Sequence, residues 1–202
     1  VRQAPVQDAP PPRADQLAIA ALINEGAKVL EIGCGEGALL HLLARERGAR
    51  ARGIEPDRAK AHACVARGLS VVQSELESGL ADFQTGAFDF VVFSHTLQGL
   101  RDPHWALREA RRAGERVIVS IANAAHWRAR LRLMLSGRAL SDKQGAIAHR
   151  WSVRDFAALA QDARLHIERA TPLSRGNPGA PFARSMLRAN WFGEEAVFLL
   201  AP

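Results

Sequence analysis

Tyrosine is absent from this sequence of 202 residues, and cysteine occurs only at Cys34 and Cys64. Without tyrosine the chain lacks a Tyr-x-x-x-Lys pair, which argues against a nicotinamide-dependent reductase. The surroundings of the two cysteines suggest neither a disulfide nor a metal framework. We therefore expect no metal site and a reducing, cytoplasmic setting.

Long apolar runs are also missing, since no stretch approaches the roughly 18 apolar residues that a membrane span needs. We therefore expect no membrane partner. Residues 1–14 are rich in Pro, Ala and Gln and lack the apolar core of a secretory signal. They are interpreted as a flexible leader, with a trimmed targeting peptide as the alternative because the chain does not begin with Met. Residues 15–202 are long enough for one domain with one sizeable core.

Positive charge is in excess, with 27 Lys and Arg against 21 Asp and Glu and a net charge of +6. Such an excess raises nucleic-acid binding as a hypothesis. Against it, the arginines are spread through many predicted helices, and no aromatic-basic ribonucleoprotein motif or Cys/His finger occurs. A nucleic-acid partner is therefore not expected.

Strand-like apolar runs alternate with segments of helical period, which predicts an α/β fold with helices on both faces of a mostly parallel sheet. Asp57 and Ser152 are placed to cap predicted helices, the latter in a capping box with Asp155. A Gly- and Pro-rich stretch before the last strand favours an antiparallel pair at the end. The predicted strands are 28–32, 51–55, 69–73, 88–94, 116–121, 165–170 and 195–200.

A glycine-rich turn follows the first predicted strand, where Gly33, Gly35 and Gly37 let the backbone approach a ligand closely. Gly33-x-Gly35-x-x-Ala38 also satisfies a dinucleotide fingerprint, so the glycines alone do not decide the ligand. Glu31 precedes the loop and would oppose a pyrophosphate, whereas it favours the cationic amino group and sulfonium of S-adenosylmethionine. A tight turn without a ligand is the alternative.

Acidic residues follow the next two strands. Glu55 can accept both ribose hydroxyls in charge-assisted hydrogen bonds, or it is simply a solvated acid at a strand end. Glu75 is placed to contact the adenine amino group with the Leu76 amide beside it, although Glu77 could substitute. The predicted cofactor-binding residues are Glu31, Gly33, Cys34, Gly35, Gly37, Glu55, Pro56, Glu75, Leu76 and Ser94.

These residues resemble the MetW family of bacterial methionine-biosynthesis proteins from about residue 15 to the C-terminus. The family-specific strings are Thr96-Leu97-Gln98 and His126-Trp127-Arg128-x-Arg130; the glycine loop is shared with many methyltransferases. The resemblance implies a class I methyltransferase fold with strand order 3-2-1-4-5-7-6, S-adenosylmethionine as cofactor and a link to methionine synthesis. It also implies action alongside a homoserine O-acyltransferase. The alternatives are therefore a methyltransferase with an unknown acceptor and a non-catalytic accessory or regulatory subunit of that acyltransferase.

The chain departs from the family pattern on the acceptor side. Residues 121–125 read Ile-Ala-Asn-Ala-Ala where the family has Phe-Pro-Asn-Phe-Gly, so the loop can hold different backbone conformations. The segment 141–149 is shortened. We interpret the chain as a diverged member whose acceptor or partner differs.

Three histidines are candidates for proton transfer, because imidazole titrates near neutral pH. His95 is the best placed, directly after the strand whose end faces the donor methyl in this architecture. A structural role is the alternative for each. The candidate set on the acceptor or partner side is His126, Trp127, Arg128, Arg130 and His149.

The predicted helix 124–135 has one apolar face, formed by residues 127, 131, 134 and 135, beside a basic edge. Packing of this face into the core is one interpretation. A surface for a protein partner or an anionic acceptor is the other.

Overall fold

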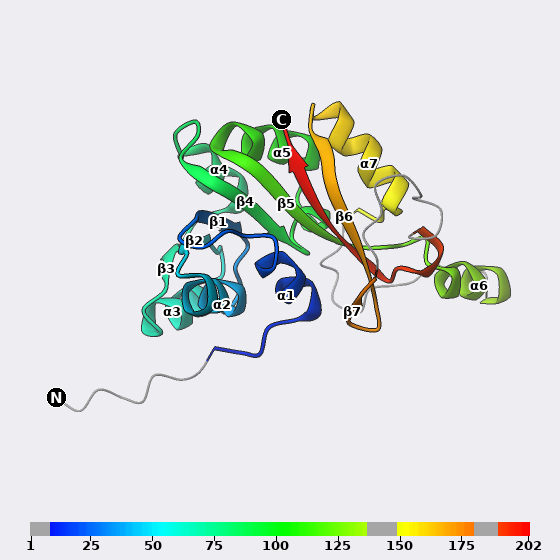
Figure 1. The fold of residues 1–202 in the computed structure, drawn as a ribbon, viewed down its shortest axis with the longest axis horizontal. Coiled ribbons are helices and arrows are strands. Elements are labelled where there is room, and N and C mark those ends of the chain that lie inside the picture. Colours follow the sequence, from blue (N-terminus) through cyan, green and yellow to red (C-terminus); the bar gives the residue numbers. More distant parts are fainter. Residues whose placement is uncertain (1–8, 137–148, 180–189) are drawn as a thin grey trace.

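Eight strands form one sheet in the computed structural model, which describes residues 9–136, 149–179 and 190–202. Their order is β3-β2-β1-β4-β5-β8-β6-β7 (Figure 1). The predicted seven-strand order is confirmed, and the two-residue β7 adds an outer edge. The strands are β1 Lys28–Ile32, β2 Arg50–Ile54, β3 Ser70–Val72, β4 Phe88–Ser94, β5 Gly114–Ala122, β6 His166–Ser174, β7 Asn177–Pro178 and β8 Glu195–Ala201.

The first five strands are parallel, and β8 runs antiparallel to both of its neighbours, β5 and β6. This arrangement confirms the antiparallel pair expected from the Gly- and Pro-rich stretch. Since parallel strands end at the same edge of the sheet, the loops after β1, β2, β3 and β4 meet there.

Helices fill the connections between strands. Asp57 accepts hydrogen bonds from the first turn of α3, and Ser152 and Asp155 form the predicted capping box of α7. Pro103 begins α5 in the first turn, where its missing N–H is tolerated. The helices are α1 Ala14–Ala20, α2 Ala38–Arg47, α3 Arg58–Ala66, α4 Leu76–Ala81, α5 Pro103–Ala113, α6 Trp127–Ser136 and α7 Val153–Asp162, with a 3-10 turn at Leu97–Gly99.

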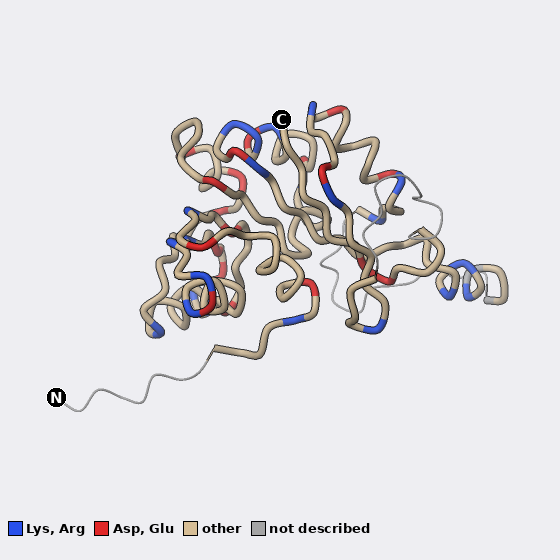
Figure 2. Tube along the Cα trace, in the orientation of Figure 1, with Lys and Arg blue, Asp and Glu red and all other residues tan. Residues whose placement is uncertain are grey.

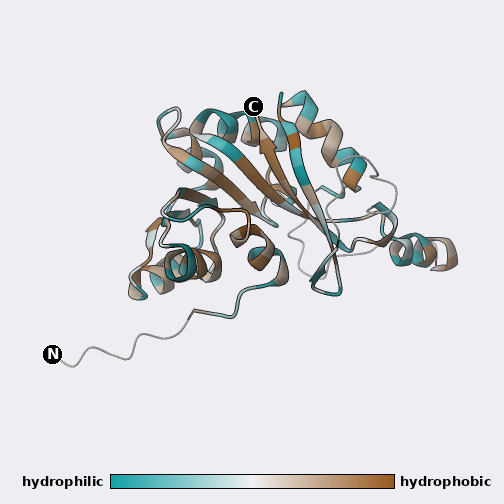
Figure 3. Ribbon diagram, viewed as in Figure 1, coloured by the Kyte–Doolittle hydropathy of each residue, from teal (hydrophilic) through white to brown (hydrophobic). Residues whose placement is uncertain are grey.

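Each face of the sheet has its own apolar core. On one face Phe93 and Phe198 pack with Phe156 of α7, in a cluster that also includes apolar side chains of α5. On the other face Ile19 of α1 and Leu43 of α2 share a cluster with apolar side chains of β1, β4, β5 and β8. Figure 3 shows the matching hydrophobic colour along the central strands. The sheet is therefore the middle layer of a three-layer sandwich.

Helix α6 projects from this body (Figure 1). One of the two interpretations of its apolar face, that it packs into the core, is wrong. Leu131 is 45% exposed, Met134 82% and Leu135 79%. The amphipathic pattern is real, but its apolar side faces outward in the described part of the chain.

Among the described residues, no helix is long and apolar enough to cross a membrane. Lys and Arg are distributed over many elements, as Figure 2 shows, in agreement with the spread seen in the sequence.

Candidate functional site

The glycine loop joins β1 to α2, and all three of its glycines have positive φ: +73° at Gly33, +55° at Gly35 and +81° at Gly37. Their surroundings differ. A Cβ atom at position 33 would lie 2.7 Å from Cγ2 of Thr96, whereas one at position 35 would meet nothing within 4 Å. Gly35 is therefore the glycine whose missing side chain leaves open space beside the loop.

Glu31 lies under this loop with 1% of its surface exposed, and its Oε2 atom has no hydrogen-bond partner in the described part of the chain. Burial raises the pKa of this carboxyl well above its ordinary value. The negative charges of Asp15 and Glu55 act in the same direction, and Arg13 opposes them. A buried carboxyl oxygen without a donor is costly, so this atom is suited to receive a cationic or N–H group.

Glu55 stands at the carboxyl end of β2, beside the glycine loop. Its Oε2 accepts a hydrogen bond from the N–H of Gly35 at 2.7 Å, and its Oε1 accepts one from the N–H of Asp57 at 3.1 Å. The side chain is buried. These bonds hold the Glu55 carboxyl group next to the open side of Gly35.

Cys34 and Cys64 are both buried free thiols. Burial raises the pKa of each thiol, and nearby Glu31 adds to the shift at Cys34. The thiols are therefore uncharged and poor nucleophiles. The Sγ of Cys64 donates to the Gly35 carbonyl at 3.3 Å, so the pair supports the loop.

The predicted adenine residues follow β3. Glu75 is exposed at the N-cap position of α4, and Leu76 is half-buried beside it. Oε1 of Glu77 accepts a hydrogen bond from the N–H of Arg101 at 3.4 Å. That bond leaves Glu75 as the better candidate for an external ligand. Pro56, between the Glu55 and Asp57 positions, is exposed.

A polar network that the sequence does not predict lies at the ends of β4 and β5. Asp15 of α1 is 1% exposed, and its Oδ2 accepts hydrogen bonds from Oγ of Ser94 and Oγ of Ser120, both at 2.8 Å. Arg13 donates to Asp15 and also to Ser94. Burial alone would raise the pKa of Asp15, but the hydrogen bonds from Arg13 and Ser120 and the charges of His95 and Arg13 lower it overall. Asp15 is therefore a fixed anion.

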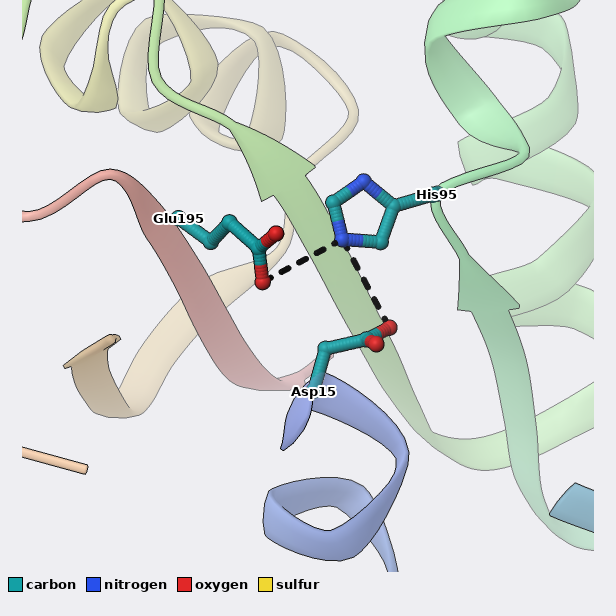
Figure 4. A group of neighbouring side chains, drawn as sticks. All are labelled: Asp15, His95 and Glu195. Carbon is teal, nitrogen blue, oxygen red and sulfur yellow. Dashed lines mark ion pairs between the residues drawn. The ribbon is translucent and has the colours of Figure 1, made fainter. Parts of the chain in front are cut away.

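His95 joins this network at its solvent side. Its Nε2 lies 3.6 Å from Oδ2 of Asp15 and 3.6 Å from Oε2 of Glu195, as Figure 4 shows. The residue has φ of +58°, a left-handed backbone that is uncommon outside glycine. Asp15 and Glu195 were missed in the sequence because each is an isolated acid, far from His95 along the chain.

The remaining candidates lie apart from the glycine loop. His126 lines a hollow of about 290 Å³ with Asn123, Arg128, Glu194 and others, and burial lowers the pKa of its imidazole. His149 stacks on Trp151, and its Nε2 lies 3.1 Å from the Leu100 carbonyl oxygen.

Around α6, Arg128 lies over the ring of Trp127, and Arg130 lies over the ring of Trp191. The two arginines therefore pack on aromatic rings at α6.

His149 differs from these residues, because its contact with the Leu100 carbonyl fits a structural role.

Comparison with known proteins identifies the family and the fold. The family model described as methionine biosynthesis protein MetW matches residues 13–200. The chain belongs to the MetW family.

A curated relative of this MetW-family chain is the bifunctional methionine biosynthesis protein MetXA/MetW of Rhodopirellula baltica. The two are 32% identical over 133 residues, which cover 61% of the chain and 21% of the relative. The chain thus spans about a fifth of the length of this relative.

Solved structures share the fold. An S-adenosylmethionine-dependent methyltransferase of Thermotoga maritima superposes with a TM-score of 0.70 at 20% identity, covering 93% of this chain and 87% of that one. The [4+2]-cyclase SpnF superposes with a TM-score of 0.67 at 15% identity, covering 93% and 80%. The chain therefore has the methyltransferase-like fold of its family, and because that fold also carries a cyclase, the reaction has to be argued from the site.

Proposed function

We propose that this MetW-family chain binds S-adenosylmethionine at the carboxyl edge of β1, β2 and β3 and transfers its methyl group to an acceptor beside β4. The observation that carries the proposal is the unpartnered Oε2 of buried Glu31, directly before a glycine loop with an open side at Gly35. Since both cysteines are free thiols, we propose a reducing, cytoplasmic setting.

The residues present fit the cofactor at each of its parts. Glu31 would receive the amino group of the methionine moiety, which satisfies its unpartnered oxygen. Glu55 would take the two ribose hydroxyls, and Glu75 with the Leu76 amide would hold the adenine. When bound, the cofactor supplies a methyl group on a sulfonium, and the chain positions the acceptor against it. The walls of the cofactor site would be formed in part by Gly33, Cys34, Gly37 and Pro56.

The acceptor side is the end of β4. Ser94 is buried and bonded to Asp15, while His95 is partly exposed beside Glu195. The His95 imidazole is the group of this edge that can take a proton from an acceptor. Methyl transfer also proceeds by positioning alone, so His95 is proposed as an aid to the reaction.

Calorimetry tests the cofactor assignment. We expect heat from S-adenosylmethionine or S-adenosylhomocysteine and none from NAD. Glu55→Ala removes two charge-assisted hydrogen bonds, about 2–3 kcal/mol together, so affinity should fall about 30- to 150-fold. Glu168→Ala, which removes an exposed acid paired with Arg116, should bind like the unchanged protein. Binding of NAD alone, or full affinity in a folded Glu55→Ala variant, would contradict the assignment.

A second function is an accessory subunit of a homoserine O-acyltransferase. It is favoured by the relative whose name joins MetXA and MetW in one chain and by the exposed apolar face of α6. In that case the cofactor site would serve sensing or stability, and Trp127, Arg128 and Arg130 would belong to the contact surface.

A further inference from the structure

Three side-chain atoms of the kinds that bind metal ions lie close together beside the end of β4, although they come from distant parts of the chain. They are Oδ2 of Asp15 from α1, Nε2 of His95 after β4 and Oε2 of Glu195 from β8, all within 4.8 Å of one another (Figure 4). Each of the three side chains can supply a metal ligand, the His95 imidazole in its neutral form. The group therefore attracts a cation placed between them.

The first atom is held in place by its own partners. Ser94 and Ser120 donate to the same Asp15 oxygen that faces His95, and Arg13 donates to both Asp15 oxygens. Carboxylates that bind metals are commonly fixed by such surrounding hydrogen bonds. Two carboxylates against one guanidinium leave the cluster negative in a chain whose net charge is +6.

The other two atoms have no competing partner. Within the described ranges, the side chains of His95 and Glu195 make no hydrogen bond with other protein groups, and their ion pairs are those of this cluster. The N–H of His95 donates to Oγ of Ser120 at 3.0 Å, which anchors the left-handed backbone and directs the ring toward the carboxylates. Such a backbone is strained for a residue other than glycine and is concentrated at functional sites.

We propose that Asp15, His95 and Glu195 bind a divalent transition-metal cation. One imidazole with two carboxylates suits Mn²⁺, Fe²⁺ or Zn²⁺. For tetrahedral Zn²⁺, bonds of about 2.1 Å separate ligand atoms by about 3.4 Å, close to the two spacings of 3.6 Å from His95. Three protein ligands leave positions for water or an acceptor oxygen, on the side where His95 and Glu195 are partly exposed.

This proposal goes beyond the proposed function and does not depend on it. It differs from the expectation of no metal site, which was drawn from the two cysteines and their surroundings. A cation here would occupy the lone pair of the His95 imidazole, so His95 would act on an acceptor through the cation.

The test is calorimetric titration of the metal-stripped full chain with Mn²⁺, without cofactor. We expect saturable binding of one ion per chain. Glu195→Gln keeps the shape of the side chain and removes its charge, and His95→Asn removes the imidazole while tolerating positive φ. Each should weaken Mn²⁺ binding at least about tenfold, whereas the control Glu168→Gln should not change it.

Thermal denaturation of each variant checks that it is folded. Absence of saturable Mn²⁺ binding up to millimolar concentration would overturn the proposal, as would equal Mn²⁺ affinity in folded Glu195→Gln and His95→Asn variants. Titration with S-adenosylmethionine is a separate measurement, so failure of the cation site and failure of the cofactor assignment can be told apart.

Discussion

Glu31 and Asp15 show how two acids near each other come to opposite ionisation. Both are buried, but Asp15 receives hydroxyl and guanidinium donors, whereas one oxygen of Glu31 receives none. Consequently the pKa of Asp15 is lowered and that of Glu31 is raised. The ionised carboxylate of Asp15 faces the acceptor edge, and the Glu31 carboxyl lies under the glycine loop.

The substitution Glu31→Gln tests the raised pKa of Glu31 through the pH dependence of the free energy of unfolding. A carboxyl whose pKa is raised by folding is protonated in the folded chain and ionised in the unfolded chain above its ordinary value of 4.5. The contribution of the Glu31 carboxyl to stability is therefore fully present below that pH. As pH rises further, the free energy of unfolding falls by at most about 1.4 kcal/mol per pH unit. As pH rises above 4.5, the variant should gain stability relative to the unchanged protein in urea denaturation.

The same variant should bind S-adenosylmethionine less tightly, because an amide cannot supply a negative charge to the cofactor amino group. A stability difference that does not change with pH would mean that Glu31 ionises in the folded chain as it does in the unfolded one.

At the scale of elements, the loop between β1 and α2 needs glycine for two different reasons, close packing at Gly33 and an open side at Gly35. Mutation can separate them. Gly33→Ala should lower stability by about 1–3 kcal/mol, because the new methyl would press on Thr96 and the φ is positive. Gly35→Ala meets no neighbour and should cost about 1 kcal/mol. Its methyl would instead narrow the open side of the loop and weaken cofactor binding.

Thermal denaturation and calorimetry on both variants check this prediction. Wild-type cofactor affinity in Gly35→Ala would show that the ligand does not approach that side.

The sequence predicts these elements well where the signal is local. The apolar runs of β1 and β4, the glycine loop and the caps at Asp57 and Ser152 each depend on neighbouring residues, and the structure contains them. The Asp15 network was missed, because β-strand order brings residues together that no spacing along the chain connects. The apolar stripe of α6 was recognised, but whether it meets the core depends on where the chain carries the helix.

At the scale of the whole molecule, the described part of the chain has an exposed apolar surface around α6. Trp127, Leu131, Met134 and Trp191, together with Arg130, line a hollow of about 430 Å³. The sequence of α6 has arginine and no acidic residue, and Figure 2 shows only positive charge on it. A large exposed patch of this kind is typical of interaction sites, and here it suits an acidic partner surface with an apolar centre.

Replacing Leu131 and Met134 together by Ser tests the accessory function. If α6 is the contact, the double variant should lose co-purification with a homoserine O-acyltransferase and keep its affinity for S-adenosylmethionine. Its unfolding free energy should change by less than about 0.5 kcal/mol per site, since both residues are exposed. Val65→Ser, an exposed apolar residue on α3, is the matched control.

Undiminished capture of the acyltransferase by the double variant would place the contact elsewhere on the chain. Capture without formation of S-adenosylhomocysteine in cell extract would favour the accessory function over the enzyme.

Because β8 lies between β5 and β6, the order of synthesis differs from the order of the sheet. A ribosome releases β5 long before residues 195–201, so the nascent chain holds Val117 and Val119 at an unpaired edge until β8 emerges. Such an edge invites pairing with other chains. Glu195 belongs to this strand, so the cluster with Asp15 and His95 forms only after β8 has been synthesised. We therefore expect chaperone dependence to be greatest for chains stalled before β8.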